Sequence, residues 1–344
     1  MSLLSVENLE VLFNTDDGVI TAVDKIGFEL EEGEVLGLVG ESGSGKSVTA
    51  KSLMQLNPLN TFYGKNSSIR LKLGVGELDV LRLKSSKELV VVRGGAISMI
   101  FQEPMASFAP AITIGSQMVE QLMIHTSLSR SAVQELSIEM LQRVGISEAD
   151  KRFHQYAFEL SGGMRQRAMI AMAIACEPAV LIADEPTTAL DVTIQAQILD
   201  LLNDLQQETQ MSIILITHDL GVVARMADEV MVMYAGQVVE HGGVDDVFYR
   251  SAHPYTLVLR GAMPSNRRSA SQTLVPIDGS PPDLFQPPQG CGYCARCPHA
   301  MKICGTEPPS TTTVNSNHWS RCWLHDNENP NRPETLYFAA GAER

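Results

Sequence analysis

The stretch that most limits how this chain can fold lies directly after an apolar run near the N-terminus. Residues 37–47 read GLVGESGSGKS and match G-x-x-x-x-G-K-[ST]. Glycines let successive backbone N–H groups turn toward one phosphate, and a helix that starts there presents its positive end to the same anion. We therefore expect a strand, a phosphate-binding loop and a helix. The loop comprises Gly40, Glu41, Ser42, Gly43, Ser44, Gly45, Lys46, Ser47 and Val48.

Short apolar runs elsewhere are typical of buried strands, at residues 34–40, 179–185, 212–218 and 229–234. Helical patterns separate the later runs, and strands that alternate with helices predict an α/β domain with a largely parallel sheet. Residues 111–157 lack such runs. Their apolar residues recur at three- and four-residue intervals, which favours a helical insertion at about 103–165.

Polar side chains at the ends of two apolar runs complete a phosphate-transfer site. Lys46 is expected to reach the β- and γ-phosphates, and Ser47 to offer its hydroxyl to Mg²⁺. Asp184 would hold Mg²⁺ through water, and Glu185 would polarise the attacking water as general base. The alternative is that both acids form a solvated strand end. A lone histidine such as His218 is more often structural, but its place after a strand favours a γ-phosphate contact.

Charge and hydropathy exclude several classes of function. The 344 residues include 40 acidic and 26 basic ones, so the net charge is −14. Such a surface repels nucleic acid and anionic lipid, so any membrane attachment is expected to go through another protein. The N-terminus does not read as a signal peptide, and the longest apolar run, residues 168–176, is shorter than the roughly 20 residues that span a bilayer. We expect a cytoplasmic chain with reduced thiols.

The segment LSGGMRQR, residues 160–167, has no role in a generic phosphate-loop hydrolase. Its place between Gln102 and Asp184 resembles the ATP-binding subunits of ABC transporters, over about residues 4–260. Physically, Ser161, Gly162 and Gly163 would open the start of a helix to a phosphate. The resemblance implies a P-loop NTPase with an ABC-type β-subdomain and a helical insertion. It also implies a head-to-tail dimer in which each signature segment closes on the partner's ATP.

The resemblance also implies roles for single residues. Gln102 would link Mg²⁺ and the γ-phosphate to the insertion, Asp191 would sense the opposite site, and His218 would be the switch histidine. Phe13 stands where an aromatic ring stacks on adenine, although a core position is an equal alternative. The expected catalytic residues are Lys46, Gln102, Glu185 and His218, the expected Mg²⁺ ligands are Ser47, Gln102 and Asp184, and Ser161 and Gly163 would contact the γ-phosphate across the dimer.

Longer stretches resemble the dipeptide/oligopeptide permease branch of that family. They are residues 99–110, 160–199, 276–291 and the HPYT of 253–256. The resemblance implies an ATPase that powers uptake of di- or oligopeptides at the cytoplasmic face of the membrane. It would work with a second, paralogous ATPase subunit, two transmembrane permease subunits and an extracellular binding protein. Import of oligosaccharides or nickel by the same machinery is the alternative, and a soluble non-transport ABC ATPase is a remote one.

Beyond the nucleotide domain, taken as residues 1–260, we expect a proline-rich arm at 261–290, a cysteine-rich region at 291–324 and a tail at 325–344. The resemblance implies a [4Fe–4S] cluster on four cysteines, which are Cys291, Cys297, Cys304 and Cys322, with Cys294 as an extra thiol. Zinc is the second candidate, because four thiolates also suit a tetrahedral site, and metal-free thiols are the third. A metal would staple this small irregular arm, which has little core of its own.

Overall fold

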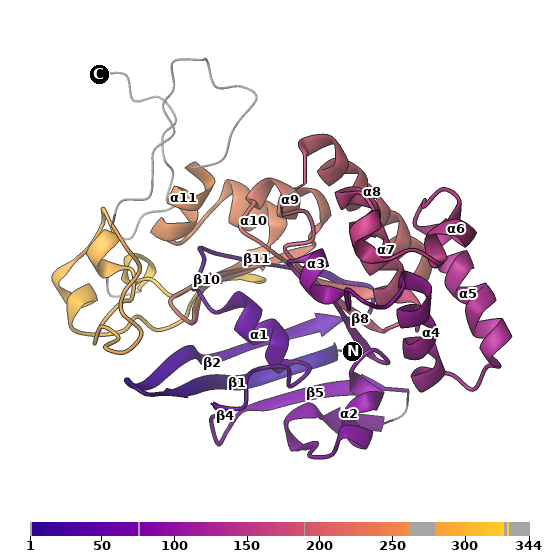
Figure 1. Cartoon of the computed structure of the whole chain (residues 1–344). Coiled ribbons are helices and arrows are strands. Elements are labelled where there is room, and N and C mark those ends of the chain that lie inside the picture. Colours follow the sequence, from indigo (N-terminus) through magenta and orange to yellow (C-terminus); the bar gives the residue numbers. More distant parts are fainter. Residues whose placement is uncertain (1, 75, 189, 262–278, 327–328, 330–344) are drawn as a thin grey trace.

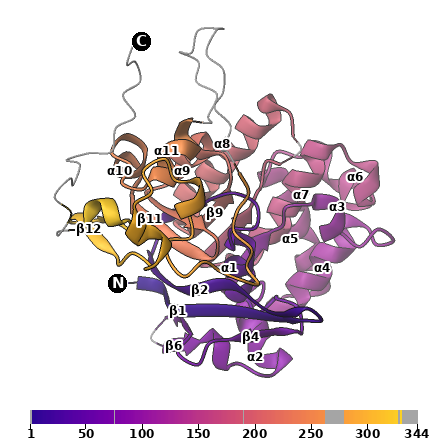
Figure 2. The same ribbon diagram turned by 90° about the vertical axis from the view of Figure 1, so that its left-hand side faces the viewer.

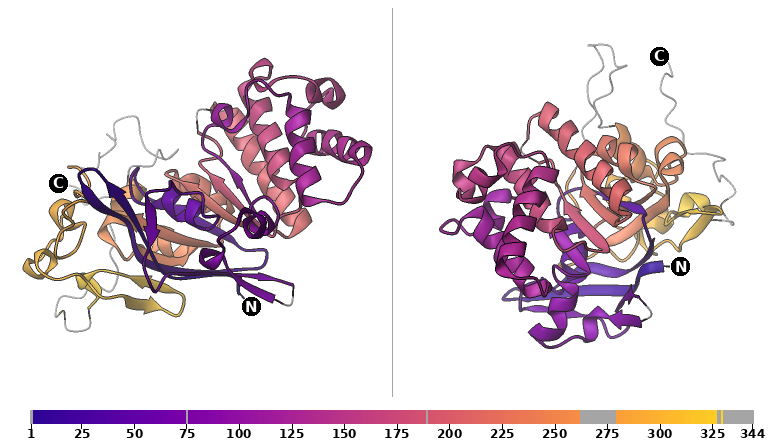
Figure 3. Two further views of the ribbon diagram at one scale, coloured as in Figure 1. Left: turned by 60° about the horizontal axis from the view of Figure 1, so that its bottom comes forward. Right: turned by 90° about the vertical axis from the view of Figure 1, so that its right-hand side faces the viewer.

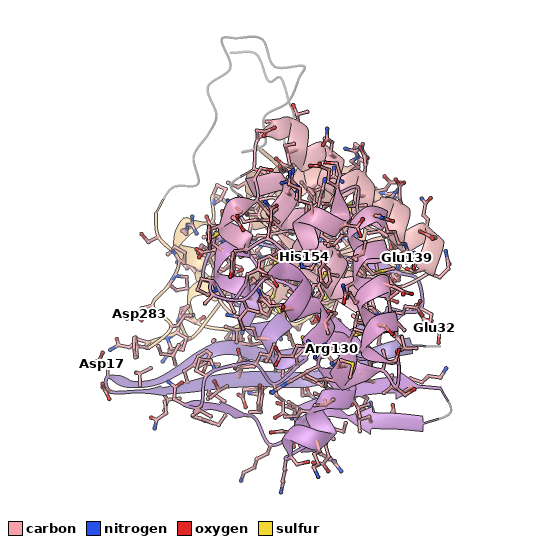
Figure 4. The ribbon with its side chains drawn as sticks, turned by 45° about the vertical axis from the view of Figure 1, so that its right-hand side comes forward. Asp17, Glu32, Arg130, Glu139, His154 and Asp283 are labelled. Atoms are coloured by element: carbon pink, nitrogen blue, oxygen red, sulfur yellow. The ribbon has the colours of Figure 1, made fainter. Side chains whose placement is uncertain are left out.

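The computed structural model describes residues 2–74, 76–188, 190–261, 279–326 and 329. Within them, a mainly parallel sheet lies between helices and a second, antiparallel sheet (Figure 1). The antiparallel sheet has the order β2-β1-β5-β6, and β4 pairs with β1. Its strands are β1 (Ser2–Thr15), β2 (Gly18–Glu31), β4 (Thr61–Tyr63), β5 (Ser68–Leu73) and β6 (Gly76–Asp79). In Figure 4, Asp17 marks the tip of the long β1–β2 hairpin.

The larger sheet has the order β12-β13-β11-β10-β3-β9-β8-β7 and is parallel from β10 to β7. Its strands are β3 (Val35–Val39), β7 (Ile97–Ile100), β8 (Val180–Asp184), β9 (Ser212–Thr217), β10 (Glu229–Tyr234), β11 (Gln237–Gly243), β12 (Thr312–Asn315) and β13 (His318–Ser320). The four apolar runs of the sequence form β3, β8, β9 and β10. Every residue of β3, β8 and β9 is buried, as expected for central strands covered on both faces. The α/β class is thereby confirmed.

The two faces of the larger sheet contribute to two separate cores. Val35 and Val39 of β3 join one core with the helices, while Leu36 and Leu38 join the other core beneath the antiparallel sheet. This alternation follows from the two-residue period of a strand. The helices around the sheet are α1 (Lys46–Ser52), α2 (Ser86–Val92), α8 (Val192–Thr209), α9 (Leu220–Met226), α10 (Val244–Tyr249) and α11 (Pro254–Gly261), with the 3₁₀ turn η1 (Val80–Arg82).

A group of helices between β7 and β8 lies at one end of the molecule (Figure 3), and its last helix packs against β7. It contains α3 (Pro104–Ser107), α4 (Ile114–His125), α5 (Arg130–Arg143), α6 (Ala149–Phe153), the 3₁₀ turn η2 (Ala157–Glu159) and α7 (Gly162–Ile174). Helix α5 buries Val133, Ser137, Met140 and Leu141, and this three- and four-residue spacing is the pattern that predicted the insertion. The hydroxyls of Thr113 and Ser129 cap α4 and α5.

The cysteine-rich region differs from the irregular arm that the sequence predicted. Strands β12 and β13 form a hairpin, and β13 pairs with β11, so this region extends the sheet of the nucleotide domain (Figure 2). The 3₁₀ turns η3 (Cys294–Arg296), η4 (Lys302–Gly305) and η5 (Trp323–His325) complete it. The buried His318 Nε2 lies 2.8 Å from Glu240 Oε1 of β11, which fixes the hairpin. Residues 262–278 of the predicted arm and most of the predicted tail lie outside the described residues.

Candidate functional site

The loop between β3 and α1 has the backbone that its glycines allow. Gly43 and Gly45 have φ values of 80° and 103°, and Gly45 directly precedes α1. A Cβ atom on Gly45 would lie 2.7 Å from the carbonyl oxygen of Ala22, so a side chain cannot fit there. The loop therefore wraps closely around the start of α1, where unpaired N–H groups are available to an anion.

Lys46 lies buried between the loop and two acidic residues. Its Nζ donates to the carbonyl oxygens of Gly40 and Glu41, at 2.7 and 2.9 Å. Burial lowers the pKa of Lys46, while the carboxylates of Glu185, Asp184 and Glu41 act in the opposite direction. The ammonium group is thus held by loop carbonyls beside the acids at the end of β8.

Asp184, the last residue of β8, meets the first turn of α1. Ser47 Oγ donates to Asp184 Oδ1 at 3.1 Å. Burial raises the pKa of Asp184, and the bond from Ser47 with the nearby Lys51 and Lys46 partly offsets that rise. A hydroxyl and a carboxylate side by side are hard oxygen ligands of the kind that Mg²⁺ prefers when phosphates and waters complete its shell. These two residues fit a Mg²⁺ ion that is bound together with a nucleotide.

Glu185 joins three segments that are distant in sequence. Its carboxylate accepts from Thr188 Oγ1 at 2.8 Å and from Gln102 Nε2 at 2.9 Å, and lies 3.1 Å from His218 Nδ1. Burial raises the pKa of Glu185, but the bonds from Thr188 and His218 outweigh it and lower the pKa below 4.5. Its φ of 48° places a non-glycine residue in the left-handed region, which is conformationally strained. Glu185 is therefore an ionised, oriented carboxylate at neutral pH.

These residues surround two adjoining hollows. One, of about 180 Å³, is lined by Ala22, Ser42, Gly43, Gly45, Lys46, Ser47, Val48, Gln102 and Glu185. The other, of about 410 Å³, shares Ser47 and Gln102 and also contacts Asp184. Both lie at the carboxyl ends of the strands, where open α/β sheets bind ligands. A larger cavity of about 860 Å³ lies at the opposite ends of β8 and β9, against Ala179 and Met211, and contains none of the predicted site residues.

The signature segment opens α7 in the helical group. Ser161 Oγ accepts from the Met164 N–H at 3.3 Å and caps the helix. A Cβ atom on Gly163 would lie 3.1 Å from Ile194 Cγ2 of α8, and Asp191 Oδ1 caps α8 by accepting from the Ile194 N–H at 3.0 Å. The structure thus brings the signature and Asp191 together. Neither hollow at the loop is lined by residues 161–163.

Comparison with known proteins places this site in a family. A family model described as "ABC transporter" matches residues 23–188, and one described as "Oligopeptide/dipeptide transporter, C-terminal region" matches residues 239–304. The dipeptide transport ATP-binding protein DppD of Bacillus subtilis is 49% identical over 324 residues, which cover 94% of this chain and 95% of that one. The chain belongs to the ABC transporter family. It is an ABC-type ATPase of the oligopeptide/dipeptide group.

Other members and solved structures agree with this assignment. The oligopeptide transport ATP-binding protein OppD of Escherichia coli is 49% identical over 308 residues, covering 90% of this chain and 89% of that one. The cbiO1 structure from Clostridium perfringens has a TM-score of 0.59 at 29% identity, over 72% of this chain and 91% of that one. A dimeric ABC cassette, MJ0796, has a TM-score of 0.61 over 70% of this chain and 98% of that one; at 24% identity it supports the fold alone.

Two residues of this ABC ATPase site escaped the sequence analysis. Thr188 contacts Glu185 directly, and the buried Gln166 of α7 donates from Nε2 to the Pro186 carbonyl oxygen at 2.6 Å. Gln166 therefore ties the signature helix to the segment that follows Glu185. Gln166 lies inside the signature segment of residues 160–167, but the sequence gives neither Gln166 nor Thr188 a role of its own. Only the three-dimensional contacts identify these roles.

Phe13 lies on β1, opposite Ile20 of β2 and Thr61 of β4. Its ring is partly buried and packs against the core beneath the antiparallel sheet. Phe13 lines neither hollow at the loop.

The cysteine-rich region does not form a metal site in the described part of the chain. No group of three or more His, Cys, Asp or Glu side chains there is arranged to hold a metal ion. Cys291 and Cys297 pack against the apolar core, and Cys304 Sγ accepts from the Met301 N–H at 3.4 Å. Burial, with the nearby thiols, raises the pKa of Cys322 to about 12. The structure therefore does not support the expected iron–sulfur cluster, the zinc alternative or a metal-stapled arm.

No helix in the described residues is both long enough and apolar enough to cross a membrane.

Proposed function

We propose that this chain binds MgATP at the loop of residues 40–48, hydrolyses it, and thereby powers uptake of di- or oligopeptides across the cytoplasmic membrane. The observation that carries the ATPase chemistry is the convergence on Glu185 of Gln102, Thr188 and His218, beside Lys46 and the Ser47–Asp184 pair. The peptide cargo is supported by the relatives, which are named dipeptide and oligopeptide transport proteins, and by the match to their C-terminal region.

In the proposed reaction, Lys46 and the loop N–H groups neutralise the phosphates, and Ser47 and Asp184 hold Mg²⁺. Glu185 orients the attacking water and accepts its proton, since it is ionised at neutral pH. His218 and Gln102 hold the Glu185 carboxylate in place, and both become free to contact the γ-phosphate when ATP enters. These residues stabilise the negative charge of the phosphates and hold the reacting groups in position, which is the main requirement for phosphoryl transfer.

We also propose that the chain pairs head to tail with a second ATPase subunit on the cytoplasmic face of two membrane permease subunits, with an extracellular binding protein delivering the cargo. Support comes from the signature: Ser161 is exposed, caps a helix start, and lies away from the loop of its own chain. An exposed helix start of this kind is available to the γ-phosphate held by a partner.

Glu185→Gln tests the proposed chemistry. In the complex with its membrane partners, this variant should bind MgATP, hold it in a closed dimer, and hydrolyse it at least about a hundredfold more slowly, because a general base is lost. The measurement is single-turnover hydrolysis together with retention of labelled ATP on the complex.

Glu177→Gln is a matched control. Glu177 also has a positive φ, of 50°, but it is exposed and lines the cavity at the opposite ends of the strands. Its substitution should leave turnover unchanged. Turnover of Glu185→Gln at the rate of the unsubstituted complex would refute Glu185 as the base.

We further propose that Cys291, Cys297, Cys304 and Cys322 hold a [4Fe–4S] cluster with a structural role. The proposal rests on the resemblance of this region to the permease branch, which implies these four ligands. Cys322 also lies near enough to Cys291, Cys297 and Cys304 for their charges to affect its pKa. Zinc on the same thiolates is the alternative, because four thiolates also suit a tetrahedral site.

A further inference from the structure

A side chain of the cysteine-rich region contacts the phosphate loop. Arg296, in η3, forms a two-pronged ion pair with Glu41, the second residue of the loop. Its Nη1 lies 2.7 Å from Glu41 Oε2, and its Nη2 lies 3.0 Å from Glu41 Oε1. The Arg296 side chain is only 5% exposed, and Glu41 is 23% exposed, so the pair is shielded from water and from screening by salt.

Two buried tyrosines contact this arginine, and a third packs against both of them. Arg296 Nη1 donates to Tyr234 Oη at 3.2 Å, and its Cζ lies 5.7 Å from the centre of the Tyr234 ring and 6.0 Å from that of Tyr293. The three rings pack against one another with centroid distances of 4.7 to 5.3 Å. These rings come from β10, α11 and the cysteine-rich region. The guanidinium group therefore packs against a cluster of rings that three parts of the chain hold in place.

The third tyrosine reaches the loop itself. Tyr255 belongs to the HPYT segment at the start of α11, and its Oη accepts from the backbone N–H of Glu41 at 2.8 Å. Glu41 is thus held at its carboxylate by Arg296 and at its N–H by Tyr255. The proposed ATP chemistry uses neither of these contacts.

The position of Glu41 affects the lysine that is proposed to bind phosphate. The carbonyl oxygen of Glu41 accepts from Lys46 Nζ at 2.9 Å and from the Ser44 N–H at 3.2 Å. A shift of Glu41 would therefore move both an acceptor of Lys46 and the turn that leads to Gly45. The path from Arg296 to Lys46 consists of direct contacts through a single loop residue.

We propose that Arg296 is a positioning residue for the phosphate loop, so that the cysteine-rich region sets the affinity of the site for MgATP. This proposal rests on the proposed ATP site and adds a role for a segment outside it. Arg296 acts through Glu41, together with Tyr255, and touches no phosphate. We call the contacts of Arg296 and Tyr255 with Glu41 the Glu41 clamp. Because the loop must already have its binding conformation when ATP arrives, loss of this clamp weakens binding of MgATP more than it slows the chemical step.

Arg296→Gln tests the proposal in the complete complex, by measuring KM and kcat for MgATP. We expect KM to rise on the order of tenfold while kcat stays within about twofold, because a purely binding-related loss appears in KM. Arg296→Lys should give a smaller rise, since lysine keeps the charge but not the two-pronged geometry. A substitution that acts only through general stability would lower the yield of active complex without this division between KM and kcat.

A double-mutant cycle identifies the route. Glu41→Gln alone should raise KM, and Arg296→Gln with Glu41→Gln should raise it no further than the larger single effect, because both remove one interaction. Tyr255→Phe, which removes the acceptor for the Glu41 N–H, should raise KM even if Arg296→Gln fails to assemble. The matched control is Asn315→Ala, which breaks a 3.2 Å hydrogen bond between the C-terminal hairpin and Asp246 of α10, away from the loop.

The outcomes separate this inference from the proposed function. An unchanged KM in Arg296→Gln and Tyr255→Phe, or additive effects in the cycle, would overturn the positioning role. An equal rise in KM for Asn315→Ala would also overturn it, because the effect would then not be specific to the clamp. A complex that does not hydrolyse MgATP even without substitutions would instead refute the ATPase proposal.

Discussion

The glycines of the phosphate loop differ in which substitutions they tolerate, although they lie in one sequence motif. Gly43 and Gly45 both have positive φ values, but their surroundings are different. A Cβ atom on Gly43 would meet nothing within 4 Å, whereas one on Gly45 would meet the Ala22 carbonyl oxygen at 2.7 Å and Met233 Cε at 3.2 Å. Backbone conformation alone constrains Gly43, while conformation and packing together constrain Gly45.

Replacement of each glycine by alanine should separate these two effects. Gly43→Ala should lower the free energy of unfolding by about 1 kcal/mol, the usual cost of a non-glycine residue in this region. Gly45→Ala should lower it by about 3 kcal/mol, because the loop must also shift away from a backbone carbonyl group. Urea denaturation of the isolated chain measures both values. Equal losses for the two variants would show that the contact with Ala22 has no energetic importance.

At the level of elements, the start of α11 is fixed by a buried polar network. His253 Nδ1 accepts from the Tyr255 N–H at 3.1 Å, while the Glu240 carboxylate of β11 accepts from the backbone N–H groups of Ala252 and His253. His325 Nε2 lies 2.6 Å from the Ala252 carbonyl oxygen. Burial, and secondarily the nearby His325, lowers the pKa of His253 to about 3. The element is therefore built around a histidine that stays neutral.

This depressed pKa predicts a loss of stability in mild acid. Below pH 6.5 the unfolded chain takes up a proton on His253, whereas the folded chain does not until about pH 3. Stability should thus fall as the pH drops through this range, by about 1.4 kcal/mol per unit, or about 2 kcal/mol by pH 5. His253→Asn keeps an acceptor for the Tyr255 N–H without the titration, so its loss between pH 7 and pH 5 should be smaller by that amount in urea denaturation.

His154→Asn is the control for this prediction. His154 is exposed in the helical group, as Figure 4 shows, and its replacement should leave the pH dependence unchanged. The other groups that face His253, namely Glu240, Tyr293 and His325, are present in both variants. If His253→Asn lost as much stability between pH 7 and pH 5 as the unsubstituted chain, His253 would not be the residue responsible.

At the scale of the whole molecule, the cysteine-rich region is part of the nucleotide domain. Its hairpin extends the larger sheet, Tyr293 joins the core that contains the helices, and His318 and His325 are buried against β11 and the segment before α11. The region therefore has packing and buried polar contacts of its own. These contacts contribute folding energy that the reasoning from composition had assigned to a metal alone.

The proposed cluster is checked by metal analysis of the whole chain. Purified without oxygen, the protein should contain about four irons per chain and show a brown charge-transfer absorbance. Cys322→Ser should reduce the iron content, while Cys294→Ser, which alters the extra thiol, should not. A colourless protein, or one with stoichiometric zinc, would contradict the cluster. The folded nucleotide domain should persist after iron removal, because the sheet and core contacts remain.

The sequence by itself determined the parts of this protein whose chemistry is local. Unbroken apolar runs predict the central strands, and the periodicity of apolar residues predicts the helical insertion. Glycines at fixed spacing from Lys46 predict the phosphate loop. The end of β8 likewise carries Asp184 and Glu185 to the loop, because parallel strands end at one edge of the sheet. Each of these features depends on a short stretch of sequence or on the general geometry of a parallel sheet.

Only the tertiary structure decided the contacts between distant segments. Strands β12 and β13 are too short, at four and three residues, for their alternation to be recognised. They form because β13 pairs with the free edge of β11 and β12 pairs with β13. Thr188, Gln166 and Arg296 have no distinctive spacing; their roles come from the partners that folding brings to them. Glu41 and Arg296 are separated by 255 positions in the sequence, and no local pattern predicts their ion pair, since it depends on distance in space and not on separation along the chain.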